Sequence, residues 1–321
     1  PVHADLYNNL GVDIEFAVVE DVVDEGSVYN QTPLYRPAAD LHKVSEAAAM
    51  INAADKPLLI VGRGAVLSGA SKILVSIAKK ADIPIVTTPD GKTIIDESDP
   101  LFAGVIGAYG NACANITAES TDLAIFVGTQ ANDQSTMNWT MPPTKIQAVQ
   151  IDIEPKELGR NYPNTLGLYG DADTVLKQLI GFVNTKKRVE WKSEVNKYMH
   201  DEKENLNKEY PSDSSTISPY RLCKELTKVL PNDAVLVADT GNSAIWTATS
   251  IKMRPTQKYY RAAGSLGWSL PGSMGIKCAL PDRPVICFLG DGAMYYHLSE
   301  LETAVRYGIN TVTIINNNNG F

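Results

Sequence analysis

Short apolar runs alternate with amphipathic stretches along most of the chain. The apolar runs cover residues 57–61, 84–88, 123–127, 146–151, 235–239, 284–289 and 311–315. Runs of this length, rich in β-branched residues, are typical of strands buried on both faces of a parallel sheet. Strands that alternate with helices form open α/β sheets. The pattern therefore predicts an α/β fold with two doubly wound parallel-sheet domains.

The helices are predicted from the spacing of apolar residues. Residues 71–80 form an amphipathic pattern, and residues 186–209 are dense in charges of both signs. The charged segment predicts a solvated helix that links two domains. Asp40 precedes another helical pattern and is placed to cap it. The apolar face of that helix would hold Leu41, Val44, Ala47, Ala48 and Ile51.

The most specific motif lies near the end of the chain. Gly290, Asp291 and Gly292 follow the apolar run 284–289, and Asn318 lies 27 positions after Asp291, behind the next strand. Both polar ends would lie at the carboxyl edge of a parallel sheet, where ligands bind. Glycines let the backbone approach a bulky anion such as a diphosphate. The simpler alternative is a plain strand–turn–helix, and the segment 293–307 does show helical spacing.

This arrangement offers the oxygen ligands that Mg²⁺ prefers. Asp291 can supply a carboxylate oxygen, Asn318 an amide oxygen and Gly320 a backbone carbonyl. Mg²⁺ usually completes its octahedron with phosphate oxygens and water. The interval and the residue types therefore predict a magnesium–diphosphate site.

Two further segments belong to the same prediction. Gly241, Asn242 and Ser243 follow the run 235–239, and small polar residues with free N–H groups can form an anion nest. An ordinary turn with a helix cap is the alternative for this segment. The second segment, 261–272, is rich in glycine and contains Leu266. A core leucine is the alternative there.

With these motifs, the chain resembles the thiamine-diphosphate-dependent enzymes of the acetolactate synthase and benzoylformate decarboxylase superfamily. The resemblance implies thiamine diphosphate and Mg²⁺ as cofactors. It implies that the Gly264 carbonyl accepts a hydrogen bond from the aminopyrimidine and that Leu266 holds the cofactor bent, so that its amino group lies beside the thiazolium C2. The cofactor residues implied are Gly241, Asn242, Ser243, Gly264, Ser265, Leu266, Gly290, Asp291, Gly292, Ala293, Asn318 and Gly320. The metal ligands among them are Asp291, Asn318 and Gly320.

The resemblance also implies a division into domains. Residues 1–36 would be the tail of an absent pyrimidine-binding domain with its linker, and 1–6 would be its last strand. Residues 37–183 would form a central Rossmann-like domain, and 184–216 the charged helix and linker. Residues 217–321 would form the diphosphate- and Mg²⁺-binding domain, C-terminally incomplete. The family's activating glutamate would lie in the absent domain of a neighbouring subunit, so the catalytic residue stays unknown and this fragment alone is expected to be inactive.

The implied activity is decarboxylation of a 2-keto acid followed by carboligation, as in acetolactate synthases. Benzoylformate decarboxylation, or lysis or hydrolysis of a carbon–carbon bond in a diketone, is the alternative on the same scaffold. A nucleotide-binding module with a relic site is the non-enzymatic alternative. The expected partners are a small 2-keto acid or diketone and further copies of the chain, as a homodimer or homotetramer.

The central domain leaves one cofactor open. Gly62 and Gly64 begin a dinucleotide-like fingerprint, but Leu67 occupies the place of its third glycine. In the flavin-containing branch of the family an arginine lies in the loop that corresponds to 128–134, and this loop has none. We therefore expect an empty structural domain rather than FAD. ADP or a coenzyme A moiety could use the same site.

Composition limits the partners. The 321 residues carry a net charge of −8, with an isoelectric point near 5.1, which disfavours nucleic acid and anionic membranes. No run of 18 apolar residues exists that could span a membrane. Four scattered cysteines without metal spacing indicate reduced thiols and a cytoplasmic protein.

Overall fold

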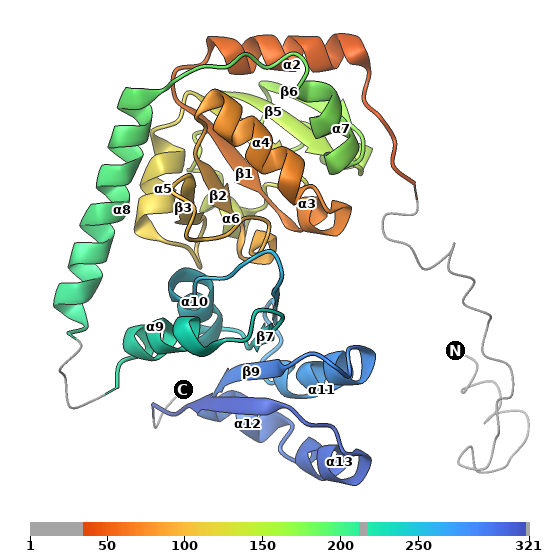
Figure 1. The fold of residues 1–321 in the computed structure, drawn as a ribbon, viewed down its shortest axis with the longest axis vertical. Coiled ribbons are helices and arrows are strands. Elements are labelled where there is room, and N and C mark those ends of the chain that lie inside the picture. Colours follow the sequence, from red (N-terminus) through yellow and green to blue (C-terminus); the bar gives the residue numbers. More distant parts are fainter. Residues whose placement is uncertain (1–34, 212–216, 319–321) are drawn as a thin grey trace, which may run out of the picture. The chain divides into compact units, whose positions relative to one another are not determined.

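The structure is a computed structural model that describes residues 35–211 and 217–318. Within this part the chain forms two parallel sheets, with six and four strands. Helices flank both sheets (Figure 1). The strand expected at 1–6, the connector that follows it and Gly320 lie outside the described residues.

The larger sheet has the strand order β3-β2-β1-β4-β5-β6, and every neighbouring pair is parallel. Two of its strands, Pro57–Val61 and Leu123–Val127, have the bounds predicted from the apolar runs and are fully buried. The six strands are β1 (Pro57–Val61), β2 (Ile85–Thr87), β3 (Phe102–Val105), β4 (Leu123–Val127), β5 (Gln147–Asp152) and β6 (Thr165–Tyr169). This is the order of dinucleotide-binding sheets, with a switch point between β1 and β4.

Helices cover both faces of this sheet. Along β1, Leu59 and Val61 belong to the core shared with α2, α4 and α7, whereas Leu58 and Ile60 belong to the core shared with α5 and α8. The helical segments are α2 (Leu41–Ala53), α3 (Arg63–Ser68), α4 (Ser71–Ala81), η2 (Pro89–Gly91), α5 (Ala112–Glu119), α6 (Asp133–Thr136), η3 (Pro155–Glu157), α7 (Ala172–Leu179) and α8 (Val189–Glu209). The alternation confirms the prediction of a doubly wound sheet.

The predicted cap of α2 is present, with one correction. The Asp40 side chain accepts a hydrogen bond from the Lys43 backbone N–H at 3.0 Å. Four of the five expected face residues are buried, but Leu41 is 59% exposed. Leu41 is the first residue of the helix.

The charged helix α8 is less solvated than predicted. Trp191 and Val195 are buried, and the Trp191 indole N–H donates to the Pro57 carbonyl at 2.9 Å. Arg188, just before the helix, is 4% exposed because its guanidinium donates to several carbonyls, including that of Ile51 at 2.6 Å. The helix is therefore anchored to the central sheet at its start.

The smaller sheet has the order β10-β9-β7-β8, again entirely parallel. Leu236 and Ala238 of β7 face the core shared with α9 and α10, and Val235 and Val237 face the other side. The elements are α9 (Pro219–Val229), β7 (Val235–Ala238), α10 (Asn242–Ser250), β8 (Lys258–Arg261), α11 (Ser269–Ala279), β9 (Val285–Gly290), α12 (Asp291–Tyr296), α13 (Glu300–Tyr307) and β10 (Val312–Asn316).

The single helix expected over 293–307 is wrong. The structure has two helices, α12 and α13, with a break at 297–299. Of the apolar residues at helical spacing, Val305 is 83% exposed and Leu298 is 46% exposed. Ala304 of the same pattern packs against the core, so the described residues cover this face only in part.

Candidate functional site

Two of the predicted cofactor residues, Ser243 and Gly290, lie together at the switch point of the smaller sheet. Strands β7 and β9 are neighbours there, although β8 lies between them in sequence. A methyl group built on Gly290, at the end of β9, would lie 4.0 Å from both the Ser243 Oγ and the Asn316 carbonyl oxygen. The ends of β7, β9 and β10 therefore converge within a few ångströms. This is the edge at which open α/β sheets bind ligands.

Asp291 is half-buried at this edge and is the first residue of α12. Among the residues that the structure describes, its carboxylate has no hydrogen bond or ion pair and does not cap the helix. Asn316 pairs in register with Gly290, so Asn318 follows at the same edge and is exposed. The end of β9 therefore places a carboxylate that is unpaired within the described residues beside an asparagine segment.

A metal ion at this edge would need ligands from outside the protein. Within the described ranges, no group of three or more His, Cys, Asp or Glu side chains could hold a metal. One carboxylate and amide or carbonyl oxygens suit Mg²⁺ only when phosphate oxygens and water complete the shell. The donor set therefore fits a metal that arrives together with a diphosphate.

Two glycines keep the backbone open in the predicted cofactor loops. Gly241 has φ +71° and Gly264 has φ +103°, and no atom of the described residues lies within 4 Å of a Cβ built on either. The positive φ angles favour glycine at both positions, whereas steric crowding by neighbouring atoms does not. The adjoining Asn242 is exposed and Ser243 is buried. Both loops leave room for a ligand to reach main-chain groups.

Asp239 anchors the glycine-rich loop 264–268 through hydrogen bonds to its side chain. This residue ends the β7 run and is fully buried. One carboxylate oxygen accepts from the Gly267 N–H at 3.0 Å and the other from the Ser269 N–H at 2.9 Å. Hydrogen bonds from two buried amides to one carboxylate are stronger than neutral ones. Asp239 therefore determines where the loop 264–268 lies relative to β7.

Leu266 lies on this loop between core and solvent. It is partly buried and packs against the cluster formed by Leu270, Leu289 and Ala293, among others. Ala293 is buried, Gly292 is half-buried, and Gly264 and Ser265 are exposed. Leu266 and Ala293 thus connect the loop to the start of α12 through one apolar cluster.

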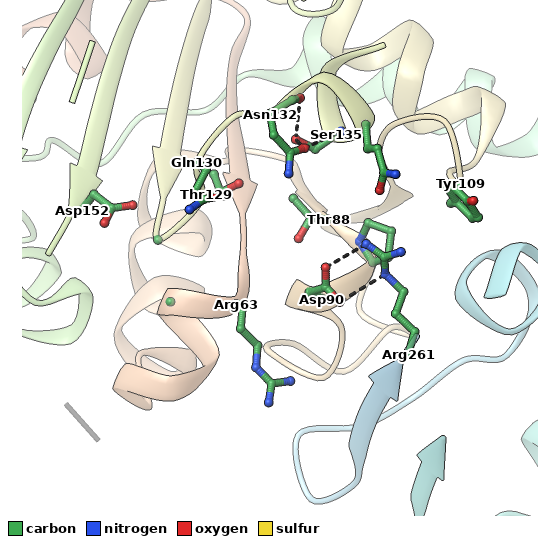
Figure 2. A pocket seen from close by; sticks show the side chains of 14 residues that line it. Arg63, Thr88, Asp90, Tyr109, Thr129, Gln130, Asn132, Ser135, Asp152 and Arg261 are labelled. Atoms are coloured by element: carbon green, nitrogen blue, oxygen red, sulfur yellow. Dashed lines mark hydrogen bonds and ion pairs between the residues drawn. The ribbon is translucent and has the colours of Figure 1, made fainter. Parts of the chain in front are cut away.

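A second pocket lies at the switch point of the larger sheet (Figure 2). It has a volume of about 280 Å³ and is lined by loops that follow β1, β2 and β4. The first and last of these loops touch, because the Gly64 N–H donates to the Gly128 carbonyl at 2.9 Å and Gly128 has φ +57°. A Cβ on Gly128 would lie 2.4 Å from the Ala65 nitrogen.

An ion pair lies across this second pocket. The Arg261 guanidinium donates to both carboxylate oxygens of Asp90, at 3.1 and 2.9 Å, and Figure 2 shows the two side chains facing each other. The Arg261 side chain is 7% exposed. Ligand pockets usually measure about 300–1,000 Å³. The volume is therefore small for FAD, which contains two nucleotides.

Comparison with known families agrees with this geometry. Residues 44–179 match the model described as thiamine pyrophosphate enzyme, central domain. Residues 239–321 match the model described as thiamine pyrophosphate enzyme, C-terminal TPP binding domain. The chain belongs to the thiamine pyrophosphate enzymes.

Curated relatives are acetolactate synthase large subunits. The probable large subunit of Methanococcus aeolicus is 28% identical, with 99% of this chain and 55% of the relative covered. The large subunit of Haemophilus influenzae is 27% identical, with 90% and 52% covered. That of isozyme 1 of Escherichia coli is 28% identical, with 88% and 50% covered. The chain spans about half the length of these relatives.

Three features of this thiamine pyrophosphate enzyme were missed by sequence reasoning. Asp239 ends a buried strand, which was the available signal for a structural carboxylate. Arg63 and Arg261 line the central pocket although the loop 128–134 has no arginine. Arg261 is 171 positions from Asp90, so no local sequence pattern predicts their pairing.

In the part of the chain that the structure describes, no helix is long and apolar enough to cross a membrane.

Proposed function

We propose that the protein containing this chain is a thiamine-diphosphate-dependent enzyme that decarboxylates a 2-keto acid and joins the product to a second carbonyl compound. The observation that supports it most is the convergence of Ser243, Gly290 and Asn316 at one switch point, beside Asp291, whose carboxylate has no partner among the described residues. The matched cofactor-binding domain and the acetolactate synthase relatives support the same activity.

The chain's own residues would hold the cofactor and its metal. Asp291, Asn318 and Gly320 would give oxygen ligands to Mg²⁺, and main-chain N–H groups of 241–243 would donate to the diphosphate. Gly264 and Ser265 would meet the pyrimidine, with Leu266 beneath it. When bound, thiamine diphosphate supplies the carbon nucleophile and the electron sink for the loss of CO₂. Asp239 would hold the loop 264–268 in position through its hydrogen bonds to Gly267 and Ser269.

The test uses the full-length protein with thiamine diphosphate and Mg²⁺. It is incubated separately with pyruvate, benzoylformate and a cyclic 1,2-diketone, while CO₂ and organic products are measured. CO₂ with acetolactate from pyruvate is the expected result. Benzaldehyde from benzoylformate, or ring opening of the diketone without CO₂, would replace the proposed substrate class by one of the alternatives. Absence of both turnover and Mg²⁺-dependent cofactor binding would overturn the proposal and favour a nucleotide-binding module.

We also propose that the complete protein is a homodimer or homotetramer in the cytoplasm. The family resemblance puts the activating glutamate on a neighbouring subunit, and all four cysteines are free thiols. The relatives' name, large subunit, is compatible with assembly. Sedimentation of an active full-length preparation should give at least a dimer. A fully active monomer would contradict this.

FAD is not part of the proposed enzyme. The central pocket is small, Asp90 and Arg261 are paired across it, and the loop 128–134 lacks the arginine of the flavin-containing branch. The purified full-length protein should show no flavin absorbance near 450 nm. A yellow preparation with stoichiometric flavin would overturn this part of the proposal.

A further inference from the structure

A cavity of about 560 Å³ lies away from both switch points. Its walls are the second half of α8, one face of α9, the end of α10 and the segment around β3. Its volume is within the range of about 300–1,000 Å³ that is usual for small-molecule sites. The central pocket, for comparison, has half this volume.

The inner surface of this cavity is apolar. Phe102 contributes a ring that is 8% exposed, and Met199 and Leu206 approach from α8. Tyr220 is also 8% exposed and comes from α9. An apolar body of a ligand would be removed from water here, which is the main favourable contribution in most small-molecule sites.

The rim of the cavity is basic although the protein is acidic overall. Four lysines line it, Lys203, Lys224, Lys228 and Lys252, and Lys228 among them is paired with Glu225 at 2.8 Å. The carboxylates in the lining are Glu97 and Glu202, and Glu202 is already occupied. It accepts from the Ala112 N–H at 2.9 Å and from the Cys113 N–H at 3.3 Å. The rim therefore favours an anionic group on the ligand.

Glu97 gives an independent indication of a ligand. Its side chain is 3% exposed, and one carboxylate oxygen accepts from Lys92 Nζ at 2.7 Å and from the Met253 N–H at 3.2 Å. The other oxygen, Oε1, has no partner among the described residues. Buried polar atoms of native proteins are nearly always hydrogen-bonded. Glu97 lines the cavity, so a small displacement of its carboxylate would bring Oε1 within reach of an N–H or O–H donor on a molecule there.

We propose that this cavity binds a small organic anion that has an apolar ring system and one N–H or O–H donor. The apolar wall would hold the ring, the lysine rim the anionic group, and Glu97 Oε1 the donor. The proposal is independent of the proposed enzyme activity, because none of these groups belongs to the thiamine diphosphate site.

The probe is 8-anilinonaphthalene-1-sulfonate, which combines aromatic rings, a sulfonate and an anilino N–H and fluoresces when desolvated. Full-length protein is titrated with it in the absence of thiamine diphosphate. We expect one saturable site. Leu206→Trp, which fills the cavity from α8, should abolish the saturable signal. The double variant Lys224→Glu/Lys252→Glu should weaken binding by about tenfold, from the loss of two exposed charge contacts.

A matched control separates the cavity from other apolar surface. Val305→Glu removes an 83% exposed apolar side chain on α13 and should leave the titration unchanged. Thermal unfolding of each variant establishes that it is folded. If Leu206→Trp is folded and still shows the saturable signal, or if only Val305→Glu removes it, the proposal is overturned.

Discussion

The two sheets have switch points of the same topology but opposite chemistry. At the central one the loops touch backbone to backbone and the pocket is bridged by Asp90 and Arg261. At the other, Gly241 and Gly264 have open space and Asp291 has no partner among the described residues. Topology brings polar groups to both edges. Whether an edge can accept a cofactor depends on how many of those groups already have partners within the protein.

The central edge uses its polar side chains for contact with the other sheet. Asp90 pairs with Arg261 at the end of β8, and two residues later Lys92 reaches the end of α10. Lys92 Nζ donates to the Ala248 carbonyl at 2.9 Å and to the Ile251 carbonyl at 3.0 Å. Helix α10 begins at the predicted diphosphate loop. The central domain thus positions a helix that the proposed cofactor site needs.

The largest effect, on cofactor binding, is expected from Asp291 at the switch point of the smaller sheet. Asp291→Ala should abolish Mg²⁺-dependent binding of thiamine diphosphate by the full-length protein, because it removes the only side-chain carboxylate proposed for the metal. Its stability should change little, since the carboxylate makes no hydrogen bond or ion pair with the described residues. Calorimetric titration with cofactor and Mg²⁺ measures the binding. Asp282→Ala, on the exposed turn before β9, is the control and should bind normally. Full affinity in Asp291→Ala would refute the metal assignment.

The next largest effect, on stability, is expected from Lys92 at the switch-point edge of the larger sheet. Lys92→Met leaves Glu97 buried without its cation, and breaking a buried ion pair typically destabilises by about 3–5 kcal/mol. Burial raises the pKa of Glu97 even beside Lys92. A raised folded-state pKa gives stability that is present below the unfolded value of about 4.3 and is lost as pH rises through the folded value. The loss in Lys92→Met should therefore be larger at pH 8 than at pH 5.

Denaturant unfolding at both pH values measures this loss. The double variant Lys92→Met/Glu97→Gln should recover most of the stability, because it no longer buries an unpaired charge. Equal losses at the two pH values, or no recovery in the double variant, would show that Lys92 acts through packing and not through charge.

Sequence reasoning succeeded where a residue's neighbours are local or its burial is complete. Strands β1 and β4 were placed at their observed bounds because a strand buried on both faces has no polar positions. The break between α12 and α13 was not seen, since helical spacing continues across 297–299. Pairings such as Asp90–Arg261 and Lys92–Ala248 join positions more than 150 residues apart. They depend on how the sheets pack, which no window of sequence contains.

The cofactor residues were predictable to different degrees. Asp291 and Asn318 follow adjacent strands, so parallel topology alone puts them at one edge. Gly264 and Leu266 lie in an irregular loop, and only the family resemblance singled them out. Asp239, which holds that loop, was assigned only to a strand. A loop's position is set by its anchor, and the anchor lies 28 and 30 positions upstream of the amides that it binds.

A smaller effect on stability is expected from Leu266→Ala. Truncating a packed leucine costs about 2–5 kcal/mol, and the lower end applies because Leu266 is only partly buried. Hydrogen–deuterium exchange at C2 of bound thiamine diphosphate should also slow, because the cofactor's amino group is no longer held beside C2. Leu270→Ala, fully buried in the same cluster, should destabilise more and leave the exchange unchanged. Exchange at the wild-type rate with weakened Mg²⁺ binding would refute the role given to Leu266.

The smallest effect is expected from breaking the Asp90–Arg261 ion pair across the central pocket, which tests whether this pair contributes to stability. Asp90→Asn keeps the shape of the side chain but removes the charge facing Arg261. The Asp90 side chain is 41% exposed, so solvent screening limits the loss to about 1 kcal/mol or less. Denaturant unfolding in 0.05 M and 1 M NaCl measures it, and the difference from wild type should shrink at high salt, where the Debye length is about 3 Å. Asp282→Asn, an exposed aspartate without an ion pair among the described residues, should change stability by less than about 0.5 kcal/mol. If Asp90→Asn loses several kcal/mol regardless of salt, the ion pair is effectively desolvated, and the central edge is closed more firmly than its exposure indicates.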